Sequence, residues 1–293
     1  MRTVLGSVMA VAAVVALAPG CGDDADDGGA EGRPNVVVTT SILGDVVREL
    51  VGDDADVEVV IPPGADPHDL APSPQQVEAM LDAGLLIVNG GGLEHGLEDT
   101  IESAIEAGAE VVVAVPAGAD DHFFSDPLLM RDAVATIERA LAAHTDLDRD
   151  SLAARAADYT RQLEEVSEAI ERILAPIPPE RRVLVTNHDT LASFAARLGF
   201  EVLEPVHPGG STLSEPSAAD MAALADEIRA RSIPAVFTDA SSSSEVVEVL
   251  GAEGVNVEVV PLHTESLGPP GSGAETYLEL VRSNATAIAE ALA

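Results

Sequence analysis

The sequence has a single cysteine, Cys21, and no lysine. A lone cysteine excludes an intrachain disulfide and a cluster of thiolate ligands, so any bound metal must be held by nitrogen and oxygen atoms. All 15 basic residues are arginine, against 51 acidic residues, which leaves a formal net charge of -36 at pH 7. This charge repels nucleic acid, and binding to nucleic acid is therefore excluded. An acidic surface also keeps a protein soluble in salty surroundings, so the charge alone does not indicate a role in attracting cations.

The first residues have the pattern of a secretion signal. Arg2 precedes an apolar run from Val4 to Ala18, which is too short to span a bilayer, and Pro19-Gly20-Cys21 ends the run. Small residues before a lone cysteine resemble the lipobox of bacterial lipoproteins, although Pro19 departs from the usual pattern. We predict a lipoprotein signal peptide at residues 1–21, with Cys21 as the lipidated residue. An ordinary cleaved signal with an unused cysteine is the alternative.

The residue composition changes after the signal and again at Asn35. Residues 22–34 are rich in Gly and Asp and have no apolar pattern, which predicts a flexible tether. From Asn35 onward, short β-branched runs alternate with helical patterns, as is typical of parallel α/β sheets. The first half has predicted strands at Val36–Thr39, Val57–Ile61, Leu85–Val88 and Glu110–Val115. The second half has them at Val183–Thr186, Glu201–Leu203, Ala235–Thr238 and Val257–Leu262.

One long helix is predicted between the two halves. Its apolar positions recur at steps of three and four, namely Leu152, Ala156, Tyr159, Leu163, Val166, Ile170 and Ile173. Ser151 is the expected N-cap, and Pro176 ends the helix. The sequence therefore predicts an α/β fold with two lobes, each a four-stranded, mostly parallel sheet with flanking helices. The lobes span residues 35–147 and 177–293, and one long rigid helix in residues 148–176 joins them.

Three shorter motifs are interpreted as structural. The Asn89-Gly90-Gly91-Gly92 segment lacks the strand-turn-helix spacing of a phosphate loop, so we interpret it as a tight turn. Asp126-Pro127 is a predicted cap and first residue for a helix from Leu128 to Ala143. The run Ser241–Ser244 is a predicted helix start, without an acid-base partner that would make one of these serines a nucleophile.

Four side chains that can bind metal follow predicted strands. His68 and His122 come after the second and fourth strands of the first half, while His188 and Glu265 come after the first and last strands of the second half. Ligands bind beyond the carboxyl ends of the strands in open parallel sheets, so we expect these side chains to meet. Three imidazoles and one carboxylate suit zinc, whereas calcium and magnesium prefer oxygen ligands. His95, His144 and His207 are predicted surface residues, and His263 is interpreted as an outer or structural neighbour of Glu265.

The chain resembles a known family through an ordered series of motifs. The motifs are TTSILGDVVRELVGD, GADPHDLAPSP, NGGGLEHGLED, TNHDTLASFAARLGFEV, GGSTLSEPSAADMAAL and HTESLGPPGSGAETYLELVRSNATAI. Together they are similar to the zinc and manganese solute-binding proteins of bacterial ABC importers, from Asn35 to the C-terminus. In that family, two α/β lobes joined by a long helix hold one metal ion.

The resemblance implies metal ligands at His68, His122, His188 and Glu265. A histidine at the third position favours Zn(II), with Mn(II) as the alternative metal. The implied partners are the divalent metal ion, the membrane permease of an ABC importer, the membrane itself through lipid on Cys21, and a metallochaperone as a further candidate. We expect a monomer that is anchored outside the cytoplasm, either on the outer face of the cell membrane or in the periplasm.

The sequence departs from the family pattern near three of these ligands. Glu265 stands where Asp is common, so its carboxylate can reach further or bind through both oxygens. The segment after His68 is Leu70-Ala71-Pro72-Ser73-Pro74 instead of an aromatic-Glu-Pro-Thr-Pro stretch. The usual Asp-Pro-His triplet is Asp120-Asp121-His122, and the segment before it lacks a His-rich loop.

Two other functions stay open at this point. Zinc on three histidines with water at the fourth position is a catalytic arrangement, and Glu265 would then be the general base of a zinc-dependent hydrolase. No HExxH-type helix occurs in the sequence, and the ligands come from both lobes, so we predict that the chain is not an enzyme. The second alternative is an adhesin or a structural lipoprotein, in which the metal is incidental.

Overall fold

The computed structural model describes residues 33–203, 218–240, 250–251, 254–255 and 257–293. The predicted signal peptide, the lipidation of Cys21 and the tether up to residue 32 lie outside the described residues. The predicted helix start at Ser241–Ser244 also lies outside them. From Arg33 onward, the chain belongs to one structural unit.

The first half is a parallel sheet with helices between its strands. Its main elements are β1 (Asn35–Thr40), α1 (Ser41–Val51), β2 (Asp56–Ile61), α2 (Pro74–Leu81), β3 (Leu85–Val88), α3 (Glu98–Ala107), β4 (Glu110–Val113) and α4 (Pro127–His144). The strands pair in the order β2-β1-β3-β4, and every pair is parallel. The predicted strands are confirmed, although β4 ends two residues early.

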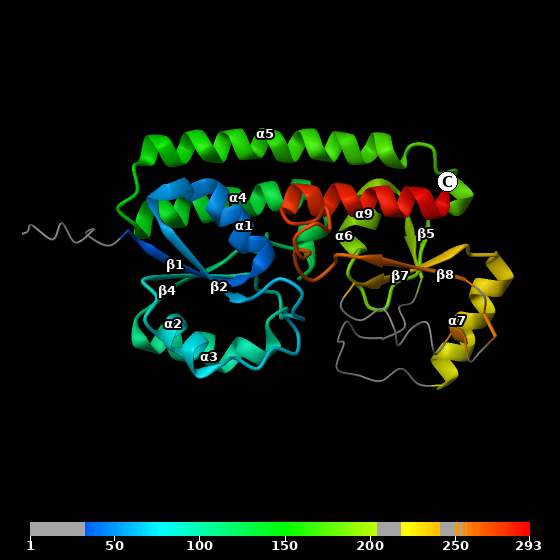
Figure 1. Ribbon diagram of the computed structural model, residues 1–293, viewed down its shortest axis with the longest axis horizontal. Coiled ribbons are helices and arrows are strands. Elements are labelled where there is room, and N and C mark those ends of the chain that lie inside the picture. Colours follow the sequence, from blue (N-terminus) through cyan, green and yellow to red (C-terminus); the bar gives the residue numbers. More distant parts are fainter. Residues whose placement is uncertain (1–32, 204–217, 241–249, 252–253, 256) are drawn as a thin grey trace, which may run out of the picture. The chain divides into compact units, whose positions relative to one another are not determined.

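Both faces of this sheet are covered, as β-branched strands without a polar face require. Successive side chains of a strand point to opposite faces, so Val36 and Val38 join one apolar cluster while Val37 joins another. Figure 1 shows α1 and α4 on one side of the sheet and α2 and α3 on the other.

The second half repeats this plan with shorter strands. Its described elements are β5 (Val183–Leu184), α6 (Ala192–Leu198), β6 (Glu201–Val202), α7 (Ala218–Arg231), β7 (Ala235–Asp239), β8 (Glu258–Leu262) and α9 (Tyr277–Leu292). Instead of one continuous four-stranded ladder, β5 pairs with β6 and β7 pairs with β8, all in parallel. A single bridge between Thr186 and Phe237 joins the two ladders, two residues before His188.

The long helix is α5 (Arg149–Leu174), and it packs against α4 of the first half and α9 of the second (Figure 1). Its buried side chains belong to an apolar cluster that also contains residues of both halves, so one continuous core runs beneath it. The prediction of Ser151 as the N-cap was wrong: the side chain of Asp148 accepts a hydrogen bond from the Ser151 N–H. Asp126 caps α4 as predicted, by accepting from the Leu128 N–H.

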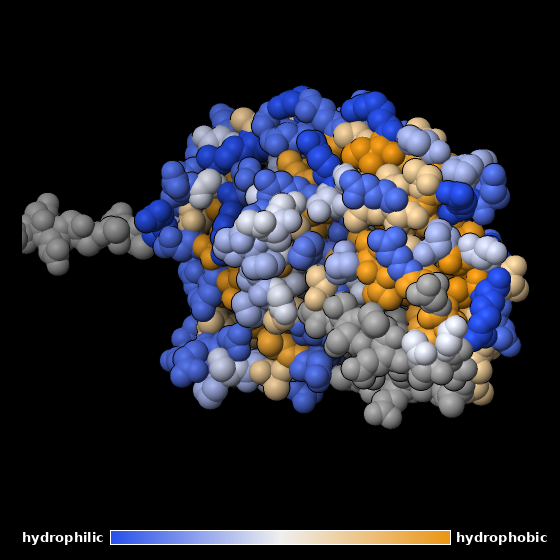
Figure 2. All heavy atoms as spheres, turned by 45° about the vertical axis from the view of Figure 1, so that its right-hand side comes forward, coloured by the Kyte–Doolittle hydropathy of each residue, from blue (hydrophilic) through white to orange (hydrophobic). Residues whose placement is uncertain are grey.

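The surface is mostly hydrophilic on the face drawn in Figure 2, with apolar patches between the polar side chains. Within the described residues, no helix combines the length and the apolar character that crossing a bilayer requires.

Candidate metal centre

The loop after β2 carries His68. The Asp66 side chain accepts a hydrogen bond of 2.8 Å from the His68 N–H, which closes a local turn just before the imidazole. Gly64 lies in the same loop with a positive φ of 80°, and its N–H donates to the hydroxyl of Ser266, 202 residues away. The His68 loop is therefore held by one hydrogen bond within the loop and by another to the loop that carries Glu265.

His122 comes directly before a single helical turn, Phe123–Ser125, that leads to the cap of α4. Its ring is held at both nitrogens. Nδ1 lies 2.9 Å from Oδ1 of Asp121, and Nε2 lies 3.2 Å from Oε1 of Glu265. The hydroxyl of Tyr277, on α9, donates to the carbonyl of Phe124 and so fixes this turn against the second half.

The second half contributes His188 and Glu265 from loops after β5 and β8. Nε2 of His188 lies 2.5 Å from Oε1 of Glu265. The segment around Glu265 is fixed on both sides. The N–H and hydroxyl of Thr264 donate to Asp239 at the end of β7, and the N–H of Leu267 donates to the hydroxyl of Ser41 in the first half.

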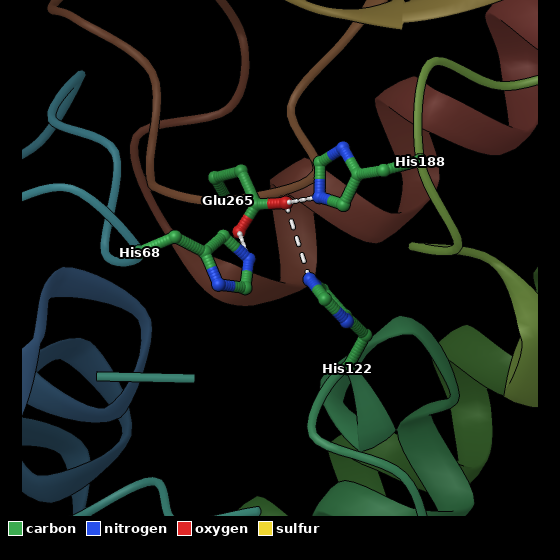
Figure 3. A group of neighbouring side chains, drawn as sticks. All are labelled: His68, His122, His188 and Glu265. Carbon is green, nitrogen blue, oxygen red and sulfur yellow. Dashed lines mark hydrogen bonds and ion pairs between the residues drawn. The ribbon is translucent and has the colours of Figure 1, made fainter. Parts of the chain in front are cut away.

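These four residues form one cluster. Each offers one potential ligand atom, and the four atoms lie within 4.8 Å of one another. The centroids of the imidazole rings of His68, His122 and His188 form a nearly equilateral triangle with sides of 5.4, 5.5 and 5.4 Å. Figure 3 shows the Glu265 carboxylate between the three rings, with a nitrogen of each ring directed toward it. All four side chains are buried, at no more than 3% exposure.

The electrostatics of the cluster are those of a buried anion among imidazoles. Burial alone raises the pKa of Glu265, but the positive charge of His122 and hydrogen bonds from His122 and His188 outweigh it and lower that pKa far below its usual range. Burial lowers the pKa of His122, but the charge of Glu265 and the hydrogen bond to Asp121 raise it well above its usual range. For His68, burial dominates and lowers the pKa. These shifts favour an ionised Glu265 carboxylate and a protonated His122 imidazole in the metal-free cluster.

The distances within the cluster fit a tetrahedral zinc ion. Two ligand atoms bonded to zinc at about 2.0 Å, with a tetrahedral angle between them, lie about 3.3 Å apart. The Nε2 atoms of His188, His122 and His68 lie 2.5, 3.2 and 3.6 Å from the nearest oxygen of Glu265. Nε2 of His68 and Oε2 of Glu265 are buried and have no hydrogen-bond partner within the part of the chain that the structure describes, and a metal ion bonded to both would supply the missing interaction. The His188–Glu265 pair, at 2.5 Å, would have to move apart to reach this separation.

The other described histidines do not join this cluster. His95 and His144 are exposed, and His207 lies outside the described residues. His263 is partly buried, and its backbone exchanges hydrogen bonds with the side chain of Asn284 on α9. The structure therefore brings together all four of the predicted ligands and leaves the other described histidines apart from them.

Sequence reasoning missed the polar residues that hold these loops. Ser193 on α6 donates to Asp120, next to the His122 loop, and Arg197 on the same helix lies 2.8 Å from Asp126. These contacts join residues more than 70 positions apart, and no local pattern indicates them. The adjacency of Asp121 and His122 was visible, but spacing along an irregular loop does not show that their side chains meet.

The comparison with known proteins agrees with this geometry. Residues 36–291 match the family described as zinc-uptake complex component A, periplasmic. The chain belongs to this family. The resemblance to solute-binding proteins of metal ABC importers is thereby confirmed.

Relatives within the zinc-uptake component A family differ in the metal that their names give. The chain is 31% identical over 285 residues to the zinc-binding protein TroA of Treponema pallidum (strain Nichols), covering 91% of each chain. It is 30% identical over 294 residues to the manganese-binding lipoprotein MntA of Bacillus subtilis (strain 168), covering 93% of this chain and 94% of MntA. It is 24% identical over 289 residues to the metal ABC transporter substrate-binding lipoprotein FimA of Streptococcus parasanguinis, covering 90% of this chain and 91% of FimA.

The fold agrees with a solved structure of the family. The structure of the periplasmic zinc-binding protein TroA from Treponema pallidum superposes with a TM-score of 0.82 at 30% identity, over 89% of this chain and all of that one. The predicted two-lobe α/β fold class is confirmed.

Proposed function

We propose that this chain captures a divalent transition metal, zinc first, outside the cytoplasm and delivers it to the membrane permease of an ABC importer. The observation that carries the proposal is the convergence of four buried ligand atoms within 4.8 Å, from four separate loops. Two of these loops belong to each half of the chain, so a bound ion would be enclosed between them. The names of TroA and FimA, a zinc-binding protein and a substrate-binding lipoprotein of a metal ABC transporter, support the same function.

The ligand set favours zinc over manganese. Three imidazole nitrogens and one carboxylate oxygen suit zinc, whereas manganese prefers carboxylate, carbonyl and water oxygens. At a given nitrogen- and oxygen-containing site, the intrinsic affinity for zinc also exceeds that for manganese. Because the relatives include both a zinc-binding and a manganese-binding protein, a manganese-specific site is the alternative.

Burial of the cluster favours capture over catalysis. A hydrolytic zinc site keeps one coordination position open for water and admits a substrate to it. Here Glu265 lies among the three imidazoles, and its carboxylate is as deeply buried as they are. We therefore propose that Glu265 is a metal ligand and that the protein is not an enzyme.

The proposal extends to the organisation of the chain. Residues 35–147 and 177–293 are the two lobes, and residues 148–176 form the helix that links them. Residues 1–21 are the signal peptide, Cys21 carries the lipid, and residues 22–34 are the tether. The name of MntA as a lipoprotein supports anchoring to the outer face of the membrane.

Equilibrium dialysis of the purified protein against equal concentrations of zinc and manganese tests the proposal. We expect one zinc ion per chain, with little manganese bound. One manganese ion per chain, with zinc excluded, would establish the alternative metal. A protein that retains neither metal would rule out the proposed function.

A further inference from the structure

The residue directly before His122 contacts its imidazole. Oδ1 of Asp121 lies 2.9 Å from Nδ1 of His122, while Nε2 of the same ring is directed toward Glu265 at 3.2 Å. Asp121 is only partly buried and is not one of the four clustered ligands. Asp121 thus contacts one member of the cluster from outside the ligand set.

The contact decides which nitrogen of His122 can bind a metal. A neutral imidazole carries one ring proton, and the nitrogen without it has the lone pair that a metal requires. When Nδ1–H donates to Asp121, the lone pair lies on Nε2, which is the atom that faces the cluster. A carboxylate that accepts this hydrogen bond also makes the imidazole a stronger ligand. By contrast, Nδ1 of His188 is buried without a hydrogen-bond partner among the described residues.

The glycine-rich turn after β3 fixes the backbone of Asp121. Nδ2 of Asn89 donates to the Asp121 carbonyl at 2.8 Å, and the Asn89 N–H donates to the buried Glu94 carboxylate at 2.6 Å. Gly91 has a φ of 74°, and a Cβ added to it would lie 2.9 Å from Cα of Asp121. The Asn89–Gly92 turn is therefore packed directly against the residue that contacts His122.

We infer that Asp121 is a positioning residue, which selects the Nδ1–H tautomer of His122 and strengthens metal binding through Nε2. The Asn89–Gly92 turn holds Asp121 in place for this role. The inference rests on the proposed metal-binding function and adds a residue outside the ligand set to it.

Three variants of the full chain test the role of Asp121, with zinc affinity measured by competition with a chelator. Asp121→Ala should weaken zinc binding by about 10- to 100-fold, the usual cost of losing an outer hydrogen-bond partner of a ligand. Asp121→Asn keeps an oxygen acceptor and should lose less. Asp189→Asn is the matched control, because it removes the same charge from an exposed residue next to the ligand His188, and it should change affinity by less than about fivefold.

Nitrogen NMR of the zinc-loaded parent protein gives a readout that does not depend on any variant. We expect the ring proton of His122 on Nδ1, and a proton on Nε2 would overturn the inference. An Asp121→Ala protein that binds zinc as tightly as the parent, or an equal loss in Asp189→Asn, would also overturn it. These results leave the proposed function intact, whereas a parent protein that binds no zinc overturns the proposed function and this inference together.

Discussion

Nε2 of His188 lies 2.5 Å from Oε1 of Glu265, although 77 residues separate them in the chain. The loops after β5 and β8 bring them together, and the loops of the first half add His68 and His122 to the same carboxylate. Glu265 is thus the residue on which all three imidazoles converge, so its identity and its charge should determine the properties of the site.

Loss of one imidazole should disable the site. His122→Ala should lower zinc affinity by more than the roughly 10- to 100-fold that loss of an outer partner costs, because it removes a ligand itself. His144→Ala is the control, because His144 is the exposed last residue of α4. The zinc affinity of this variant should be unchanged. Chelator competition measures both, and an unchanged affinity in His122→Ala would remove His122 from the site.

Zinc binding at pH 7.5 should release close to one proton. The pKa of His122 is raised in the metal-free protein by Glu265 and Asp121, so the ring is still protonated above its usual value of about 6.5. A metal requires the neutral ring, so binding must displace this proton, and affinity should rise with pH above 7. Calorimetry in buffers of different ionisation enthalpy counts the protons. Release near zero would contradict the proton-bound His122–Glu265 pair.

The Glu265→Gln variant should show whether Glu265 is a metal ligand or a general base. As a ligand, Glu265 supplies a charged oxygen, so its amide variant should bind zinc more weakly. As the base of a hydrolase, it would be needed for turnover, while zinc affinity would stay nearly intact. The parent protein should also be screened for zinc-dependent turnover of ester, amide and phosphate substrates. If it shows such turnover and the variant binds zinc with normal affinity, the protein is a hydrolase and the transport function is wrong.

Asp45 should make the metal-free protein less stable as the pH rises. Burial raises the pKa of Asp45 to about 6, although its carboxylate accepts a hydrogen bond from the Tyr277 N–H at the start of α9. A raised pKa in the folded state gives a stabilisation that is complete below about pH 4 and is lost as the pH passes 6.

Asp45→Asn keeps an acceptor for Tyr277 without the charge. Its unfolding free energy should match that of the parent near pH 4 and exceed it at pH 7.5 by up to about 3 kcal/mol, at 1.36 kcal/mol per pKa unit. Denaturant titrations at both pH values measure this difference. Glu106→Gln is the control, because Glu106 is exposed on α3 and is not among the charges that act on Asp45, so it should have little effect at either pH. A less stable Asp45→Asn protein at pH 7.5 would contradict the argument.

Much of the fold could be predicted because its signals are local. The runs at Val36–Thr39 and Leu85–Val88 are β-branched or aliphatic throughout, as expected for strands covered on both faces, and the structure places strands there. The four candidate ligands could be selected because each follows a strand, and parallel strands direct such residues to one edge.

The parts that the sequence did not reveal depend on choices between similar residues or on distant contacts. Asp148 and Ser151 are both good caps at suitable positions, and only the backbone geometry shows that Asp148 is the cap. The hydrogen bond of Asp121 to His122 depends on side-chain direction in a loop, and that direction is set by the distant Asn89–Gly92 turn.

A crystal structure of the zinc-loaded protein, with anomalous scattering recorded at the zinc absorption edge, tests the central claim most directly. We predict one strong peak per chain, at about 2.0–2.2 Å from Nε2 of His68, His122 and His188 and from a carboxylate oxygen of Glu265. The Nε2 to Oε1 distance between His188 and Glu265 should increase from 2.5 Å to about 3.3 Å. A zinc peak bound elsewhere, or a cluster without a peak in protein that contains zinc, would contradict the account.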